Sequence, residues 1–117
     1  MSFNLTPNNV EFRVKVGDRA SLVLTLTDSD GAALNLSNTT TYASGKWKVW
    51  NPTGTLLING TIVFTTRASG VITYTLTADD TLSANAGIWA GEVEIKDING
   101  IITEQSRTFK FVIEESY

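Results

Sequence analysis

The chain has 117 residues, a formal net charge of −3, no cysteine and no histidine. It therefore lacks disulfides, thiolate metal ligands, cysteine nucleophiles and imidazole bases, so most hydrolytic and redox mechanisms lose a standard component. Its nine lysines and arginines are scattered along the sequence, which argues against a nucleic-acid partner. No apolar run approaches the roughly 20 residues of a membrane span, so no membrane partner is expected.

The first nine residues are expected to form an extended polar arm, because they show no strand pattern. Phe3, Leu5 and Pro7 are its predicted partner contacts, since such a segment gains order only against a neighbour. The chain also begins without the basic head and apolar run of a signal peptide, which indicates synthesis in the cytoplasm.

Residues 10–117 are expected to form a single domain, and alternation of apolar and polar residues is its main signal. The alternation predicts strands over residues 10–16 and 22–26. A third strand is expected at Lys46–Trp50, followed by a turn at Asn51-Pro-Thr-Gly54. Residues 56–58 and 62–66 are expected to pair as a hairpin around Asn59-Gly60, which is a strong two-residue turn signal.

Three further strands are predicted over residues 71–77, 87–97 and 108–113. Between the first two, Thr77 or Asp79 is expected to cap a short helical turn. In the segment 87–97 the alternation places Glu92, Glu94 and Lys96 on the solvent side. Seven to nine strands with turns about every ten residues, and no crossover helix, predict an all-β antiparallel sandwich.

Asp28-Ser-Asp30-Gly31 raises the question of a metal site, because two carboxylates flank a serine ahead of a glycine. A calcium loop needs further oxygen ligands, and the residues after Gly31 are mostly apolar. The same spacing recurs as Asp97-Ile-Asn-Gly100. Asp and Asn cap their own turns and glycine adopts positive φ, so a turn used twice is the favoured interpretation.

No catalytic set is predicted elsewhere in the chain, and no cofactor is expected. Asp79 and Asp80 are adjacent carboxylates, but residues next to each other on a short turn point apart, so a capping role is favoured over acid–base chemistry. Serine and threonine are abundant, but there is no histidine to activate them. The sequence therefore favours a protein that is not an enzyme.

The aromatic residues divide into two groups. Those on inward faces are expected to form the core: Trp47, Tyr74, Trp89, Phe109 and Phe111. Trp50 shares a face with Lys46 and Lys48, so it is a candidate protein contact or sugar-stacking residue, with burial under its own loop as the alternative. Tyr117, in the acidic tail, is a further candidate contact.

Three segments, residues 17–37, 69–100 and 108–115, carry a family resemblance. They combine an Asp-x-Asp-Gly turn and leucine-rich bend, a Gly-x-Ile-x-Tyr-x-Leu strand, and a Gly-x-Trp strand with alternation behind it. This order resembles the immunoglobulin-like N-terminal domain of the phage baseplate upper protein family, and head and tail accessory proteins built on similar sandwiches. The resemblance implies an immunoglobulin-like fold and a virion component that docks by its surface, with no enzymatic residues to carry over.

Such a domain usually heads a longer chain, whereas this sequence ends at Tyr117, which favours an accessory subunit. The expected role is a non-enzymatic phage virion protein that decorates the capsid or attaches to the tail or baseplate. Its expected partners are other virion proteins, including further copies of the chain. The alternative is a carbohydrate-binding adhesion module that uses Trp50 and Tyr42 as a stacking platform.

Overall fold

The computed structural model describes residues 2–6, 11–28, 30–51, 53–106 and 108–115. This part of the chain contains short 3-10 helices (η) but no α-helix, and no helix long and apolar enough to cross a membrane. The elements are β1 (Ser2–Thr6), β2 (Glu11–Lys15), β3 (Ser21–Thr27), β4 (Ser44–Trp50), β5 (Leu56–Thr61), β6 (Val63–Thr66), η1 (Arg67–Ser69), β7 (Val71–Thr75), η2 (Ala78–Thr81), η3 (Ser83–Asn85), β8 (Gly87–Lys96), β9 (Ile102–Ser106) and β10 (Phe109–Glu114).

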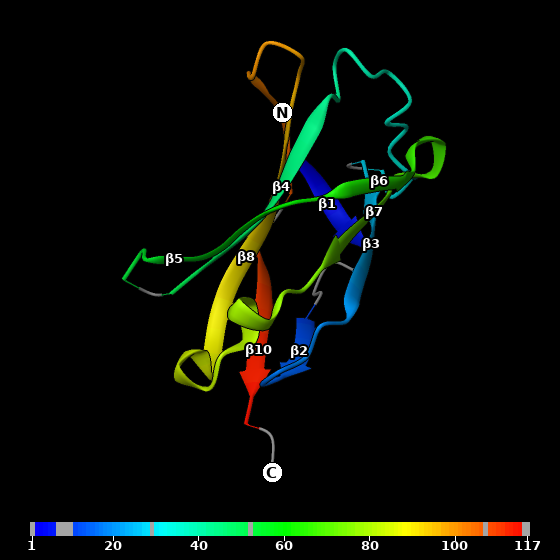
Figure 1. Ribbon diagram of the computed structural model, residues 1–117. Helices are drawn as coiled ribbons and strands as arrows, with labels where there is room; N and C mark the ends of the chain where they lie inside the picture. The colour runs from blue at the N-terminus through cyan, green and yellow to red at the C-terminus, as the bar shows by residue number, and fades with distance from the viewer. Residues whose placement is uncertain (1, 7–10, 29, 52, 107, 116–117) are drawn as a thin grey trace.

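The strands form two layers, as predicted for a β-sandwich (Figure 1). The first sheet has the order β5–β4–β8–β10–β2, and the second has the order β1–β3–β7–β6. β8 pairs with β10 along its first half and with β9 near its end, so β9 and β10 together occupy one position in the first sheet. The fold is an immunoglobulin-like β-sandwich.

The N-terminal segment is a strand where the structure describes it, although the sequence showed no strand pattern there. Leu5 pairs with Leu26 in the antiparallel β1–β3 ladder, and Phe3 pairs with Ser106 in a parallel ladder with β9. β1 therefore hydrogen-bonds to both sheets. It raises the number of strands to ten in the described part, one more than the predicted range.

Two strand pairs are parallel, β1–β9 and β2–β10, in an otherwise antiparallel fold. Each joins a strand near the start of the chain to one near its end. Because the intervening domain makes the connection, neither pair needs the crossover helix that parallel neighbours usually require.

The hairpin predicted at Asn59-Gly60 is wrong, because both residues lie inside β5. β5 pairs with β4, while β6 pairs with β7, so the chain crosses from one sheet to the other at Ile62. A Cβ atom on Gly60 would lie 2.1 Å from Cε1 of Tyr74. The glycine therefore allows a ring from the second sheet to approach the β5 backbone.

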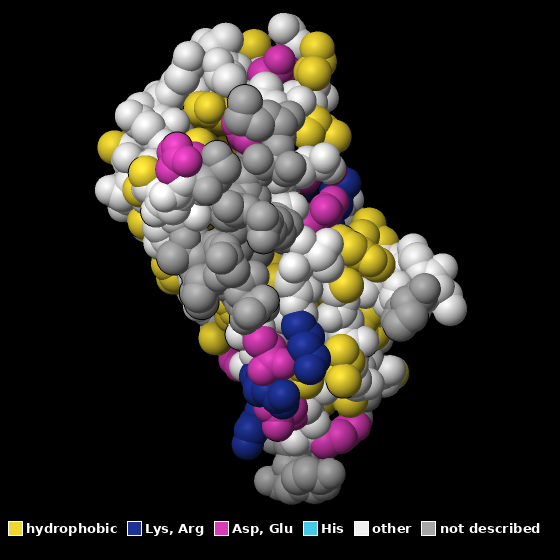
Figure 2. Space-filling view, turned by 180° about the vertical axis from the view of Figure 1, so that it is seen from behind, with side chains coloured by type: hydrophobic (Ala, Val, Ile, Leu, Met, Phe, Trp, Pro, Cys, Tyr) yellow, Lys and Arg dark blue, Asp and Glu magenta, His cyan; other side chains and the backbone are white. Residues whose placement is uncertain are grey.

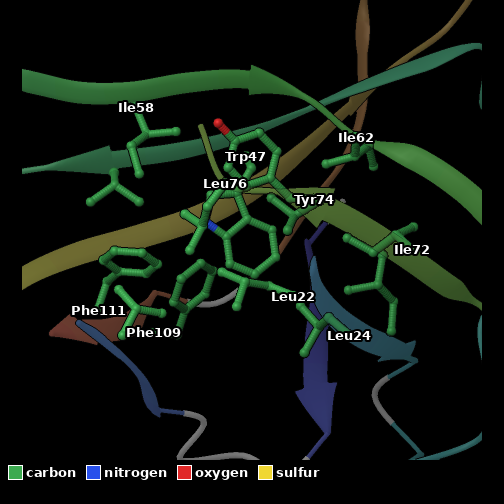
Figure 3. Packing of buried hydrophobic residues seen from close by; sticks show 14 of the residues in the cluster. Leu22, Leu24, Trp47, Ile58, Ile62, Ile72, Tyr74, Leu76, Phe109 and Phe111 are labelled. Carbon is green, nitrogen blue, oxygen red and sulfur yellow. The ribbon is translucent and has the colours of Figure 1, made fainter. Parts of the chain in front are cut away.

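The core lies between the sheets and centres on Trp47, which is fully buried (Figure 3). The Trp47 ring stacks on that of Tyr74, with 5.8 Å between the ring centres. Its centre also lies 4.9 Å from the centre of the Phe109 ring and 5.0 Å from that of Phe12, which it meets edge-on. The predicted core positions Trp47, Tyr74, Phe109 and Phe111 are buried. Trp89 is only half-buried, and its Nε1 donates to the Asn85 carbonyl.

Candidate interaction surface

The Asp28 carboxylate belongs to a turn, as the repeated spacing predicted. Its Oδ1 accepts hydrogen bonds from the backbone N–H groups of Asp30 and Ala32, at 2.9 and 3.1 Å. Asp97 Oδ1 accepts equivalent bonds from Asn99 and Ile101, at 2.9 and 3.0 Å. One carboxylate oxygen of each aspartate is therefore used to hold the turn that follows it.

A third copy of this turn follows β4 and was not recognised as such in the sequence. Asn51 Oδ1 accepts hydrogen bonds from the backbone N–H groups of Thr53 and Thr55. The glycine at the fourth position has positive φ in all three turns: Gly31 at 85°, Gly54 at 87° and Gly100 at 80°. The shared signal is Asp or Asn at the first position and glycine at the fourth.

The Asp80 carboxylate also has a structural role, in η2. Thr77, one of the two caps predicted from the sequence, is the N-cap of this helix. Asp80 Oδ2 accepts hydrogen bonds from the Thr77 backbone N–H at 2.9 Å and from the Tyr74 hydroxyl at 2.6 Å. Burial, with the neighbouring Asp80 carboxylate, raises the pKa of Tyr74 well above its usual value, so the hydroxyl stays protonated and donates. Within the described ranges, no three residues of the metal-ligating types gather into a potential metal site.

Side chains alternate between the two faces of a strand, and in β4 the odd-numbered residues Trp47 and Val49 point inward. Trp50 therefore lies on the outer face of the first sheet. It is half-buried and lies opposite Leu56 of β5 and Ala90 of β8. Leu56 is exposed, as is Ile88, two residues before Ala90. Trp50 thus sits among apolar side chains on an otherwise charged face, as expected for the centre of a protein contact.

Oppositely charged columns lie beside each other on this outer face. Lys46 of β4 pairs in register with Glu94 of β8, and Lys48 pairs with Glu92. Glu94 is buried, contrary to the expected solvent position, because the ammonium groups of Lys48 and Lys96 lie 3.1 and 3.7 Å from its carboxylate oxygens. The long side chains of Lys48, on the neighbouring strand β4, and of Lys96, on β8 itself, lie against Glu94.

The charge is confined to one of the two sheets. The described strands β1, β3, β6 and β7 contain no charged residue, whereas each strand of the first sheet except β5 carries at least one. Ion pairs join Arg13 to Glu11 and Glu114, and Lys110 to Glu11. Seen from behind, acidic and basic side chains are interspersed near the end of the molecule that holds the C-terminus (Figure 2).

The other predicted contact residues do not gather around Trp50. Phe3 and Leu5 belong to β1, on the far sheet and beside β9. Pro7 and Tyr117 lie outside the described residues. Tyr42 packs against the core before the start of β4, while Trp50 ends that strand, so about 20 Å of chain separates them. The two rings therefore form no common stacking platform.

An exposed apolar tip on the β8–β9 turn was not singled out in the sequence. Ile98 and Ile101 are 68% and 63% exposed, and Ile102 is also exposed. Asp97 fixes the turn, and the Ile98 N–H donates to the Thr40 carbonyl at 2.9 Å, which ties the tip to the neighbouring loop. Held in this way, the isoleucines form a second candidate contact region.

Glu104 is a buried acid on β9, opposite the core residue Ile95. Its Oε2 has no hydrogen-bond partner among the described residues. Burial raises the pKa of this carboxyl, and the charge of Glu104 in turn helps burial to raise the pKa of Tyr42. An inward-facing glutamate in a strand gives no distinctive pattern in the sequence.

Comparisons with known proteins found likeness in fold. No protein-family model and no curated protein sequence matches the chain. Among solved structures, the N-terminal domain of phage TP901-1 ORF48 is similar, with a TM-score of 0.71 and 15% identity, over 97% of this chain and 96% of that one. CopC from Methylosinus trichosporium OB3b has a TM-score of 0.55 and 14% identity, over 98% of this chain and 96% of that one.

Proposed function

We propose that this chain is a non-enzymatic structural protein of a bacteriophage virion, an immunoglobulin-like accessory subunit that binds the capsid shell or the tail and baseplate. The observation that carries the proposal is the likeness to the phage TP901-1 domain, at a TM-score of 0.71. That likeness covers 97% of this chain and 96% of the phage domain, so it extends over the whole sandwich and not one shared motif. As a fold likeness it supports the phage role by analogy.

The distribution of polar groups supports docking by a surface. The carboxylates of Asp28, Asp80 and Asp97 hold turns and a helix cap. The outer face around Trp50 and the isoleucine tip instead combine ordered backbone with exposed apolar side chains. Surfaces of this kind are typical of subunits that bind other proteins.

The proposal is tested with separated heads and tails from particles of a phage that encodes this chain. Purified, fluorescently labelled chain should sediment with one of the two fractions in a saturable way, and mass spectrometry should find the chain in washed particles. Unlabelled chain should compete, and an unrelated immunoglobulin-like domain should not. If neither fraction retains the chain and the particles lack it, the proposal is wrong.

A further inference from the structure

The outer face around β4 and β8 carries two columns with opposite properties. β4 contributes Lys46, Lys48 and Trp50, and β8 contributes Glu94, Glu92 and Ala90 in the same three register rows. Each row therefore sets a basic residue beside an acidic one, or a large ring beside a methyl group. Two lysines and two glutamates balance, so the six positions carry no net charge.

Part of this charge is not neutralised within the subunit. The Lys46 ammonium donates to the Thr61 hydroxyl at 2.9 Å and forms no ion pair with any described residue. Glu92 likewise forms no ion pair with the described part of the chain. Partial burial, reinforced by the neighbouring Glu94 charge, raises the pKa of Glu92 even though Lys48 acts in the opposite direction. A further cation over Glu92 would stabilise the ionised carboxylate and so lower its pKa.

We propose that this face binds a second copy of the chain. The two sheets stack face to face about a twofold axis that runs parallel to β4 and β8, midway between them. The axis places β4 of each copy over β8 of the other. Lys48 then lies over Glu92 and Trp50 over Ala90, and each contact occurs twice, because a twofold interface is isologous. Stacked sheets are about 10 Å apart, a spacing that a ring over a methyl group, or lysine over glutamate, can fill.

Charge complementarity selects a second copy as the occupant. A face of one sign would repel its own copy, whereas these adjacent columns exchange signs under the twofold operation. The inference goes beyond the proposed function by naming one partner and the residues that meet it. It rests on the residues of this face and can fail while the proposed function stands.

The test uses Lys48→Glu and Glu92→Lys in the full chain, with sedimentation velocity over a concentration series. Wild type should form dimers, and each variant alone should raise the dissociation constant by about tenfold or more, because it faces like charges. An equimolar mixture should restore dimers, since Glu at position 48 of one copy then lies over Lys at position 92 of the other. Lys15→Glu makes the same charge change on β2, beyond the expected footprint of the second copy, and should leave the dimer intact.

Lys48→Glu also removes a partner of the buried Glu94, so each variant is first checked by circular dichroism and thermal melting. Ala90→Arg breaks no ion pair but blocks the Trp50 contact, so it should also give monomers, whereas Val63→Arg on the uncharged sheet should not. Monomeric wild type at every concentration would overturn the inference, as would folded variants whose mixture stays monomeric. A monomer that still binds heads or tails would leave the proposed function standing, whereas a dimer that binds neither would contradict that function alone.

Discussion

Asp28, Asn51 and Asp97 each use one side-chain oxygen to hold two backbone N–H groups of the turn that follows. In all three turns, the N–H of the glycine at the fourth position also donates to the carbonyl of the first residue. The requirement is therefore a side-chain acceptor three bonds from Cα and a residue that tolerates positive φ, and a negative charge is not part of it. This explains why Asn51 and the two aspartates are equivalent.

Replacing Asp97 with alanine should lower the free energy of unfolding by about 1–2 kcal/mol, because two backbone donors lose their acceptor. Asp97→Asn should stay close to wild type, as the Asn51 turn indicates. Urea unfolding of the three proteins measures the difference. An asparagine variant as unstable as the alanine variant would show that charge matters and contradict the shared-turn explanation.

Gly60→Ala should destabilise the fold by about 1–3 kcal/mol, the usual cost of overpacking a core. The added methyl group would lie 2.1 Å from the Tyr74 ring, which cannot easily move because it stacks on Trp47 and hydrogen-bonds to Asp80. Thermal unfolding measures the loss, and Thr61→Ala, at the exposed neighbouring position, is the control. Equal stability of the two variants would contradict the close approach.

Glu104 gives a prediction on pH, because burial raises the pKa of its carboxyl in the folded state. The stability that this group contributes is therefore fully present below its unfolded pKa, near ~4.3, and is lost as pH rises through the folded value. Glu104→Gln should be more stable than wild type at pH 7, and the difference should vanish below pH ~4.

Urea unfolding between acidic and neutral pH tests this prediction. Glu114→Gln, which removes an exposed carboxylate 3.5 Å from Arg13, serves as the control. Because it loses only an exposed ion pair, this variant should not become more stable than wild type toward neutral pH. Burial also raises the pKa of Glu92, but Glu92 is present in both the variant and wild type. The difference in stability between the two proteins therefore isolates the contribution of Glu104. The prediction is wrong if Glu104→Gln loses stability relative to wild type as the pH rises from acidic values to 7.

At the scale of elements, η1 fastens the long connection between β3 and β4. Arg67 Nη1 donates to the carbonyls of Leu36 and Tyr42, at 3.0 and 2.7 Å, and its guanidinium lies 4.0 Å from the centre of the Phe64 ring. The Arg67 carbonyl in turn accepts from the Leu36 N–H at 2.7 Å. One residue of a single-turn helix therefore positions a connection that has no regular structure of its own.

Arg67→Ala should cost about 2 kcal/mol, since hydrogen bonds to a charged donor are worth more than neutral ones and two acceptors lose it. Amide exchange should also accelerate at Leu36, measured by hydrogen exchange with mass spectrometry or NMR. Arg13→Ala removes a guanidinium from exposed ion pairs, which contribute little to stability, and should cost clearly less than Arg67→Ala. Comparable losses in the two variants would contradict the fastening role.

Over the whole molecule, β1 is the strand that joins the two sheets, through its ladders with β3 and β9. A detachable arm would contribute nothing to the stability of the subunit, whereas a shared strand satisfies backbone groups in both layers. The first few residues are therefore expected to be part of the stability of the domain.

Deleting residues 2–9 should lower the melting temperature by at least about 5 °C, the shift that ~1 kcal/mol produces in a small domain. The loss follows from exposing the edges of β3 and β9, and differential scanning calorimetry measures it. Deleting Glu115–Tyr117, after the end of β10, is the matched control. An unchanged melting temperature for the first deletion would support the arm that the sequence suggested.

The sequence by itself determined most of the strands, the layered all-β class, the aspartate turns and the four buried aromatic positions, because alternation and turn chemistry are local properties. Tertiary structure decided the rest. Gly60 reads as a hairpin residue until Tyr74 packs over it, and Glu94 reads as solvent-exposed until Lys48 and Lys96 cover it. Pairing between strands far apart in the sequence joins β1 to both sheets and brings Trp50 of β4 beside Ala90 of β8. No local sequence pattern records which strands become neighbours.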